Sequence, residues 1–181
     1  MNPIIARYKI PLLISLVIAV GMIAFRAESN WLGALYIMIG SILGFIILDL
    51  EFPAYAYIMD PSSEKSLKIK ELIRSKSLKE FYSFINANEY FLGELSLRSV
   101  FFQVAFSIFA IYVFTTARWV LPQALSLSIL VNLFYSQIIE LSHQGTLKRW
   151  FWIYNGEISK QLQSVYIVIM AIVILFVFTL I

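Results

Sequence analysis

Apolar and polar residues alternate along this chain in long blocks. The apolar blocks are each close to the ~20 residues that an α-helix needs to cross a bilayer. They cover residues 10–25, 31–50, 97–116, 120–141 and 164–181. The pattern predicts an all-α fold, a polytopic membrane helix bundle with five transmembrane helices. We expect a single membrane domain that takes up residues 1–181.

The one long polar stretch, residues 60–96, also carries apolar residues at helical spacing. They are Leu67, Ile69, Leu72 and Ile73 in the first half and Phe81, Tyr82, Phe84 and Ile85 in the second. This spacing predicts two short amphipathic helices, which lie either on the membrane surface or beneath the bundle. We expect this insertion to be the place where a protein partner binds.

The first apolar block has a second interpretation. A basic start with Arg7 and Lys9, followed by a short apolar run, is also the outline of a cleaved signal peptide. The sequence Ala24-Phe25-Arg26 is a poor match to the small-residue cleavage site that should follow. We therefore expect the block to be a retained transmembrane helix.

The composition agrees with a membrane protein. The chain is 60% hydrophobic and 14% charged, whereas about 25% of the residues of a soluble domain are charged. A soluble fold of 181 residues could not cover so much apolar surface. The chain has no cysteine, which excludes disulfides, iron–sulfur clusters and thiolate zinc sites.

The basic residues indicate the orientation. With a cytoplasmic N-terminus and five spans, twelve of the fourteen Lys and Arg residues fall on the cytoplasmic side. Only Arg26 and Arg118 fall outside. Because positive residues favour the cytoplasmic face, we expect a multi-pass protein of the cell membrane with its C-terminus outside. Its expected partners are membrane lipids. A nucleic-acid partner is not expected, since the basic residues are interleaved with acids.

Polar residues gather at the cytoplasmic ends of several predicted helices. Asp49 and Glu51 end the second span, and Arg98 opens the third. The fourth span carries Gln137 and, at intervals of four, four and three residues, the helical face Asn132, Ser136, Glu140 and His143. In lipid such groups turn inward and contact one another. We therefore predict one polar cluster at this end of the bundle.

Two hypotheses account for the cluster. Asp49, Glu51, Glu140 and His143 are candidate metal ligands, because Glu140-x-x-His143 has the spacing by which a bundle helix presents two of them. A di-iron site would need a second such pair, and the chain has one histidine. Alternatively, Arg98 forms an ion cluster with Asp49 and Glu51. His143 would then simply lie among the lipid headgroups.

The run Gly44–Phe52 resembles the first motif of the YdjM-like membrane-bound metal-dependent hydrolases. That motif reads roughly Gly-x-x-x-Pro-Asp-x-Asp-His. Asp49 matches its first aspartate, and Glu51 stands in place of the second. Leu48 replaces the proline, and Phe52 replaces the histidine.

Two later motifs of that family have similar counterparts here, so the resemblance covers about residues 31–142. Leu97-Arg98-Ser99 is similar to Thr-His-Ser, and Asn132 with Ser136 is similar to a His and Asp four residues apart. The family's chemistry implies a bound divalent metal ion and, in this chain, Asp49 and Glu51 as catalytic residues. Three expected histidines are absent, however, and transition metals need imidazole or several carboxylates.

These departures lead to the hypothesis that the Arg98 guanidinium has replaced the metal ion. No cofactor is then expected, and the protein is a non-catalytic relative that binds a lipid or a protein. One alternative is an active hydrolase on a lipid-like or membrane-embedded substrate. A second alternative is a subunit of a transporter or of a larger membrane complex.

Overall fold

The computed structural model describes residues 3–26, 30–88, 97–154 and 158–181, and the regular structure in these ranges is helical. The long helices are α1 (Pro3–Phe25), α2 (Trp31–Leu48), α6 (Val100–Thr116), α7 (Val120–Gln144) and α8 (Lys160–Thr179). The shorter ones are α3 (Glu51–Ala54), the π-helix η1 (Tyr55–Met59), α4 (Glu64–Arg74), α5 (Leu78–Asn88) and the 3-10 helix η3 (Lys148–Phe151).

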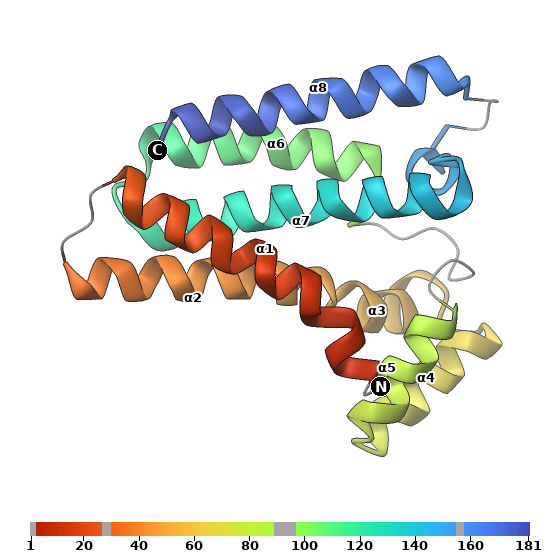
Figure 1. The fold of residues 1–181 in the computed structure, drawn as a ribbon. Coiled ribbons are helices and arrows are strands. Elements are labelled where there is room, and N and C mark those ends of the chain that lie inside the picture. The colour runs from red at the N-terminus through yellow and green to blue at the C-terminus, as the bar shows by residue number, and fades with distance from the viewer. Residues whose placement is uncertain (1–2, 27–29, 89–96, 155–157) are drawn as a thin grey trace.

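The five long helices lie side by side, and α7 is central. It packs against α1 and α2 on one side and against α6 and α8 on the other (Figure 1). Helices α3, α4 and α5 project at one end, which we call the charged end. The N-terminus lies at the charged end and the C-terminus at the opposite end (Figure 1).

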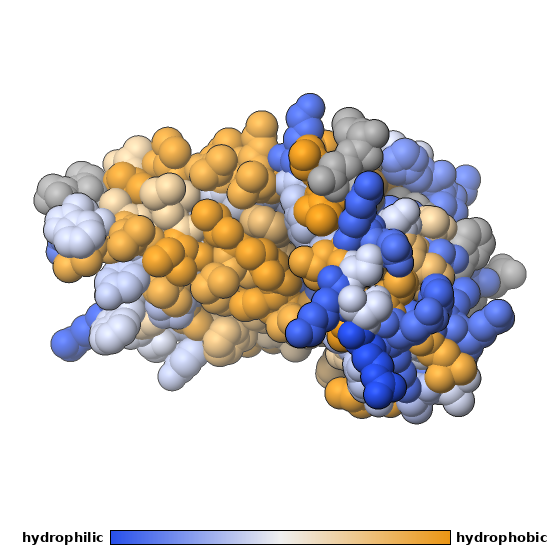
Figure 2. Space-filling model, turned by 90° about the horizontal axis from the view of Figure 1, so that it is seen from below, coloured by the Kyte–Doolittle hydropathy of each residue, from blue (hydrophilic) through white to orange (hydrophobic). Residues whose placement is uncertain are grey.

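The apolar surface of the bundle agrees with the predicted helical membrane bundle. Figure 2 shows hydrophobic residues over the middle of the bundle and hydrophilic residues gathered at the charged end. Among the described residues, four helical stretches are long and apolar enough to cross a membrane. They are Arg7–Phe25, Trp31–Met59, Val120–Gln144 and Lys160–Thr179.

The fifth predicted span, α6, has 17 residues. At 1.5 Å per residue it is about 26 Å long, slightly less than the ~30 Å of a bilayer core. A fifth crossing therefore stays a prediction. Several of the other helices extend beyond the predicted spans, since a helix does not have to stop where the hydrocarbon ends.

Helices α2 and α7 approach closely at two glycines of α2 that lie four residues apart. A Cβ atom on Gly40 would lie 2.6 Å from the carbonyl oxygen of Leu121. One on Gly44 would lie 2.5 Å from the Cβ of Ser128. A side chain at either position would push the helices apart, so these glycines serve helix packing.

A break in the second span positions the acidic residues. Helix α2 ends at Leu48, two residues before the predicted boundary, and α3 begins at Glu51. A proline ring clashes with the carbonyl group four residues earlier, and for Pro53 that residue is Asp49. The regular helix therefore stops at Asp49 and restarts immediately. The break places both Asp49 and Glu51 at the charged end.

Helices α4 and α5 confirm the amphipathic insertion. The structure places them beneath the bundle, where their apolar side chains pack against α3 and η1. The cluster comprises Phe52, Tyr55, Ala56, Ile69, Leu72, Phe81 and Ile85. The last part of the predicted insertion, residues 89–96, lies outside the described residues. Through these contacts the short helices form one packed cluster below the long helices.

Candidate functional site

Arg98 lies between two carboxylates at the charged end. Its Nη2 atom is 3.8 Å from Oδ1 of Asp49, and its Nε atom is 3.7 Å from Oε2 of Glu51. The Glu51 side chain is only 1% exposed. Opposite charges attract strongly where little water is present, so the guanidinium stabilises both acids. The structure thus brings together the three residues of the ion-cluster hypothesis.

Glu51 also holds the main chain that carries Arg98. Its Oε1 atom accepts hydrogen bonds from the backbone N–H groups of Leu97 at 2.6 Å and Arg98 at 3.0 Å. The next residue, Ser99, caps α6 by accepting a hydrogen bond from the N–H of Phe102. A buried carboxylate therefore fixes the chain immediately before α6 and determines where Arg98 points.

Asp49 connects α2 to α1 through two further residues. Arg7 donates from Nη2 to Oδ1 at 3.1 Å and from Nε to Oδ2 at 3.4 Å. The hydroxyl of Tyr8 donates to Oδ2 as well, and it is also hydrogen-bonded to the hydroxyl of Tyr82 at 2.6 Å. Arg7 reaches α5 through Asn86, whose Oδ1 accepts at 3.1 Å. Asp49 is thus the centre of a network that joins three helices.

The ring of Phe52 supports both guanidinium groups that face Asp49. The Cζ atoms of Arg7 and Arg98 lie 5.0 Å and 5.2 Å from the centre of the ring. Cations at this distance from an aromatic face are attracted by its negative potential. Phe52 stands where the resembled motif has a histidine, and here it packs beneath cations.

A second ion pair lies on the other side of the site. Arg149 Nη2 is 2.5 Å from Oε2 of Glu140, and Trp150 donates to the same oxygen from Nε1 at 3.1 Å. Arg149 and Trp150 belong to η3, which follows α7. This short helix therefore carries a guanidinium and an indole to the last part of α7.

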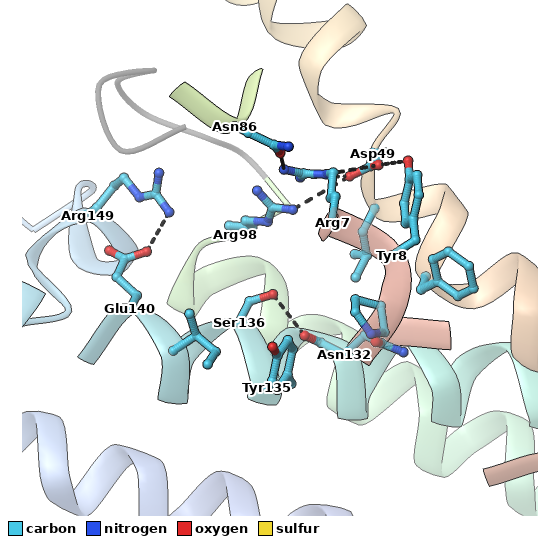
Figure 3. A pocket seen from close by; sticks show the side chains of 14 residues that line it. Arg7, Tyr8, Asp49, Asn86, Arg98, Asn132, Tyr135, Ser136, Glu140 and Arg149 are labelled. Atoms are coloured by element: carbon cyan, nitrogen blue, oxygen red, sulfur yellow. Dashed lines mark hydrogen bonds and ion pairs between the residues drawn. The ribbon is translucent and has the colours of Figure 1, made fainter. Parts of the chain in front are cut away.

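These groups enclose a cavity of about 390 Å³. Figure 3 shows Arg7, Asp49 and Tyr8 on one side, Glu140 and Arg149 on the other, and Arg98 between them. The lining residues are Arg7, Tyr8, Pro11, Phe45, Leu48, Asp49, Asn86, Arg98, Asn132, Tyr135, Ser136, Ile139, Glu140 and Arg149. The cavity therefore combines a charged rim with amide and hydroxyl groups and an apolar wall.

The predicted polar cluster is assembled in part. The members that line the cavity are Asp49, Arg98, Asn132, Ser136 and Glu140. The last three reach the same cavity because they share one face of α7. Glu51 lies behind Arg98 and does not line it.

Two predicted members lie elsewhere. Gln137 donates to Oε1 of Gln103, which also accepts from the hydroxyl of Tyr166 at 2.6 Å, so Gln137 joins α7 to α6 and α8. His143 is exposed in the last turn of α7 and does not line the cavity. Glu140 and His143 therefore do not act as a pair in this cavity.

The residues of the site do not fit a metal ion. The three candidate carboxylates, Asp49, Glu51 and Glu140, are all ion-paired with arginines. In the part of the chain that the structure describes, no group of three His, Cys, Asp or Glu residues could hold a metal. A divalent cation between Asp49 and Glu51 would also be repelled by Arg98.

Sequence reasoning missed several residues of the cavity. In the sequence, Arg7 and Arg149 count only among the basic residues that indicate orientation, and no local pattern marks Tyr8, Asn86 and Tyr135 as residues of a site. Arg7 is 42 positions from Asp49, so helix packing alone brings them together. The useful signal was the basic residue at the start of the first span, on the same side as the two acids.

The fold and the site define an α-helical membrane protein with a charged cavity at one end of its bundle. Comparisons with known protein families, with curated proteins and with solved structures gave no match.

Proposed function

We propose that this protein binds the phosphate-containing headgroup of an anionic membrane lipid in the cavity at the charged end, and that it is not an enzyme. The observation that carries this proposal is the composition of the cavity. Arg7, Arg98 and Arg149 line it together with an apolar wall. An amphiphile with a negative headgroup matches both parts.

Arginine suits a phosphate ligand for a geometric reason. Its planar guanidinium presents five N–H donors, and it binds phosphate oxygens in pairs. A guanidinium that donates to a carboxylate can therefore donate to a phosphate oxygen at the same time. The carboxylates Asp49 and Glu140 hold Arg7, Arg98 and Arg149 in fixed orientations, which reduces the entropy lost when a headgroup binds.

The position of the cavity also supports a lipid. Arg7 begins the first candidate span, and Asp49 directly follows α2. Glu140 lies in the last part of α7. Residues at the ends of spans lie at the level of lipid headgroups. The charge distribution predicted from the sequence would make this the cytoplasmic leaflet of the cell membrane.

The proposal includes a relation to the membrane-bound metal-dependent hydrolases that Gly44–Phe52 resembles. In this chain the Arg98 guanidinium would provide the positive charge that a metal ion supplies in the family. The bundle would keep the family's arrangement and use it for binding. Because no carboxylate of the site lacks an arginine partner, no residue is left in the role of a metal ligand.

Mass spectrometry of the gently solubilised protein, together with metal analysis, tests this function. We expect a copurified anionic phospholipid at about one per chain, and its loss in Arg149→Gln. The matched control is Arg118→Gln, an exposed arginine between α6 and α7, which should retain the lipid.

Three outcomes would contradict the proposal. Stoichiometric zinc, manganese or iron that is lost in Asp49→Ala would support an active hydrolase. A copurified protein in place of a lipid would support an interaction through residues 60–96. Equal lipid retention in Arg149→Gln and Arg118→Gln would show that the lipid does not occupy the cavity.

A further inference from the structure

The apolar and aromatic residues that line the cavity fall into two groups by their exposure. Phe45 and Leu48 of α2 are buried, with 8% and 4% of their surface exposed. Pro11 of α1 and Tyr135 and Ile139 of α7 line the same cavity but are only half-buried. The apolar side of the cavity therefore has α2 behind it and opens between α1 and α7.

Helix α1 moves away from α7 at this opening. Pro11 lies inside α1, where a proline removes the hydrogen bond to the carbonyl group of Arg7 and kinks the helix. Figure 1 shows α1 crossing α7 obliquely, with its N-terminal turns beside α5 and away from α7. The two helices thus diverge toward the charged end, and both contribute residues to the cavity that lies there.

The opening lies on the lipid-facing surface of the bundle. Pro11 belongs to the candidate span of α1, and Tyr135 and Ile139 belong to that of α7. The adjacent residues Leu12 and Ile138 are 39% and 41% exposed. Exposed apolar side chains on a membrane span face the hydrocarbon of the bilayer, so the opening leads into the hydrocarbon and not into water.

Charged and less polar lining residues follow one another along both helices. On α1, Pro11 comes one turn after Arg7, on the same face. On α7, Tyr135 lies about 7.5 Å along the helix from Glu140, the residue that pairs with Arg149. On both helices the charged residue is nearer the end of the span. A lipid has the same order, with its headgroup at the interface and its chain in the hydrocarbon.

The volume of the cavity limits what it can enclose. At about 390 Å³ it is near the lower end of the roughly 300–1,000 Å³ of small-molecule pockets. A phosphate headgroup fits this volume, but a membrane lipid with its long chains does not. The chains must therefore leave the cavity through an opening, and an apolar opening stabilises them.

Resting on the proposed function, we infer that the lipid enters the cavity sideways from the bilayer and that its hydrocarbon chain lies between α1 and α7, against Pro11, Tyr135 and Ile139. We call these three residues the chain-binding groove. The headgroup then reaches the arginines while the chain stays among apolar groups, so binding exposes no hydrocarbon to water. The ligand is thus a membrane phospholipid, and a water-soluble phosphate ester lacks the part that the groove binds.

A photoreactive lipid tests the groove. The full-length protein is placed in phosphatidylcholine vesicles that contain phosphatidic acid with a diazirine in its acyl chain, close to the ester. After illumination, digestion and mass spectrometry locate the adducts. We expect adducts in the chain-binding groove that disappear when unlabelled phosphatidic acid replaces part of the phosphatidylcholine. The probe's share of the bilayer does not change in this competition, so adducts from bulk lipid should persist on the exposed Val168 and Ile172 of α8.

Two tryptophan variants locate the chain. Ile139→Trp fills the groove and should lower the competed labelling of Tyr135 about tenfold, the effect of losing roughly two buried CH₂ groups. Ile138→Trp is the matched control, because Ile138 is the adjacent residue, is exposed and does not line the cavity. This control should keep the labelling of the natural sequence. If Ile139→Trp does not fold, the competition on the natural sequence still decides the question.

The outcomes separate this inference from the proposed function. Competed adducts that lie only outside the groove, or equal labelling of Tyr135 in the two tryptophan variants, would overturn the groove and leave a headgroup site. Competition by glycerol 3-phosphate as effective as that by phosphatidic acid would overturn the chain as part of the ligand. The absence of any competed adduct, together with the absence of a copurified lipid, would overturn the proposed function itself.

Discussion

Arg98 and Glu51 contact each other both through their side chains and through the main chain. Nε of Arg98 lies 3.7 Å from Oε2 of Glu51, and the backbone N–H of Arg98 donates to Oε1 of the same carboxylate at 3.0 Å. The carboxylate thus determines both the charge balance and the position of the guanidinium. This relationship explains how the buried acid Glu51 is accommodated at the charged end of the bundle.

The first prediction concerns this ion pair. Removal of one partner of a buried pair leaves an uncompensated charge and costs about 3–5 kcal/mol. We expect Glu51→Gln and Arg98→Met each to destabilise the protein by an amount of this order. The double variant Glu51→Gln/Arg98→Met should lose much less stability than the sum of the losses in the two single variants. Thermal unfolding in detergent, followed by tryptophan fluorescence, measures all three.

The comparison has its own control. Lys68 and Glu71 form an exposed pair on α4, with 47% and 66% of the side chains exposed. Exposed pairs contribute roughly 0–1 kcal/mol, so Lys68→Met should change the melting temperature little. Strict additivity of the two changes at Glu51 and Arg98 would mean that the contact contributes no coupling energy.

The second prediction concerns Tyr8. Its hydroxyl bonds to both Asp49 and Tyr82, so Tyr8→Phe removes a donor from a partly buried carboxylate. Hydrogen bonds to charged groups contribute about 1.5–3 kcal/mol. We expect a destabilisation in that range and weaker lipid binding. Tyr36→Phe, at an exposed tyrosine of α2, should have no effect on either, and equal effects of the two changes would contradict a special role for Tyr8.

Sequence periodicity predicted the helices and much of the polar cluster because both follow local rules. A step of four residues places Asn132, Ser136 and Glu140 on one helical face, and the cavity lies along that face. Gln137 is one residue beyond Ser136, turned by about 100° on the helix. This rotation explains why it faces Gln103 and Tyr166 on a different side of α7.

The partners of Asp49 could not be predicted in the same way. They come from α1 and from the chain before α6, and only the packing of the whole bundle brings them together. Basic residues at helix ends satisfy the rule for membrane orientation whether or not they also line a cavity. Arg7 and Arg149 serve in such a cavity here, and no local pattern distinguishes them from Lys9 or Lys148.

The third prediction concerns helix packing. Gly40→Ala should destabilise the protein by about 1–3 kcal/mol, the usual cost of forcing extra volume into a packed contact. The added methyl group would meet a backbone oxygen that has no rotamer with which to move away. Gly21→Ala is the matched control, since a Cβ there meets nothing within 4 Å. The control should be neutral or slightly stabilising, because alanine favours the helix over glycine.

The final prediction concerns orientation and the fifth span. The chain has no cysteine, so single cysteines can be introduced without a background. Ser62 lies just before α4, and Thr116 ends α6 at the opposite end of the bundle; both are exposed. If α6 crosses the membrane and the N-terminus is cytoplasmic, Thr116→Cys should react with an impermeant maleimide on intact cells. Ser62→Cys should react only after permeabilisation.

The two sites together separate the possible topologies. Labelling of both residues from the same side would mean that α6 does not cross, and four spans would remain. If Ser62→Cys alone reacts on intact cells, the orientation is the reverse of the predicted one. The cavity would then face the outside, and its lipid would come from the outer leaflet. Since Ser62 is at the end that carries Asp49 and Arg98, this measurement also decides which leaflet supplies the ligand.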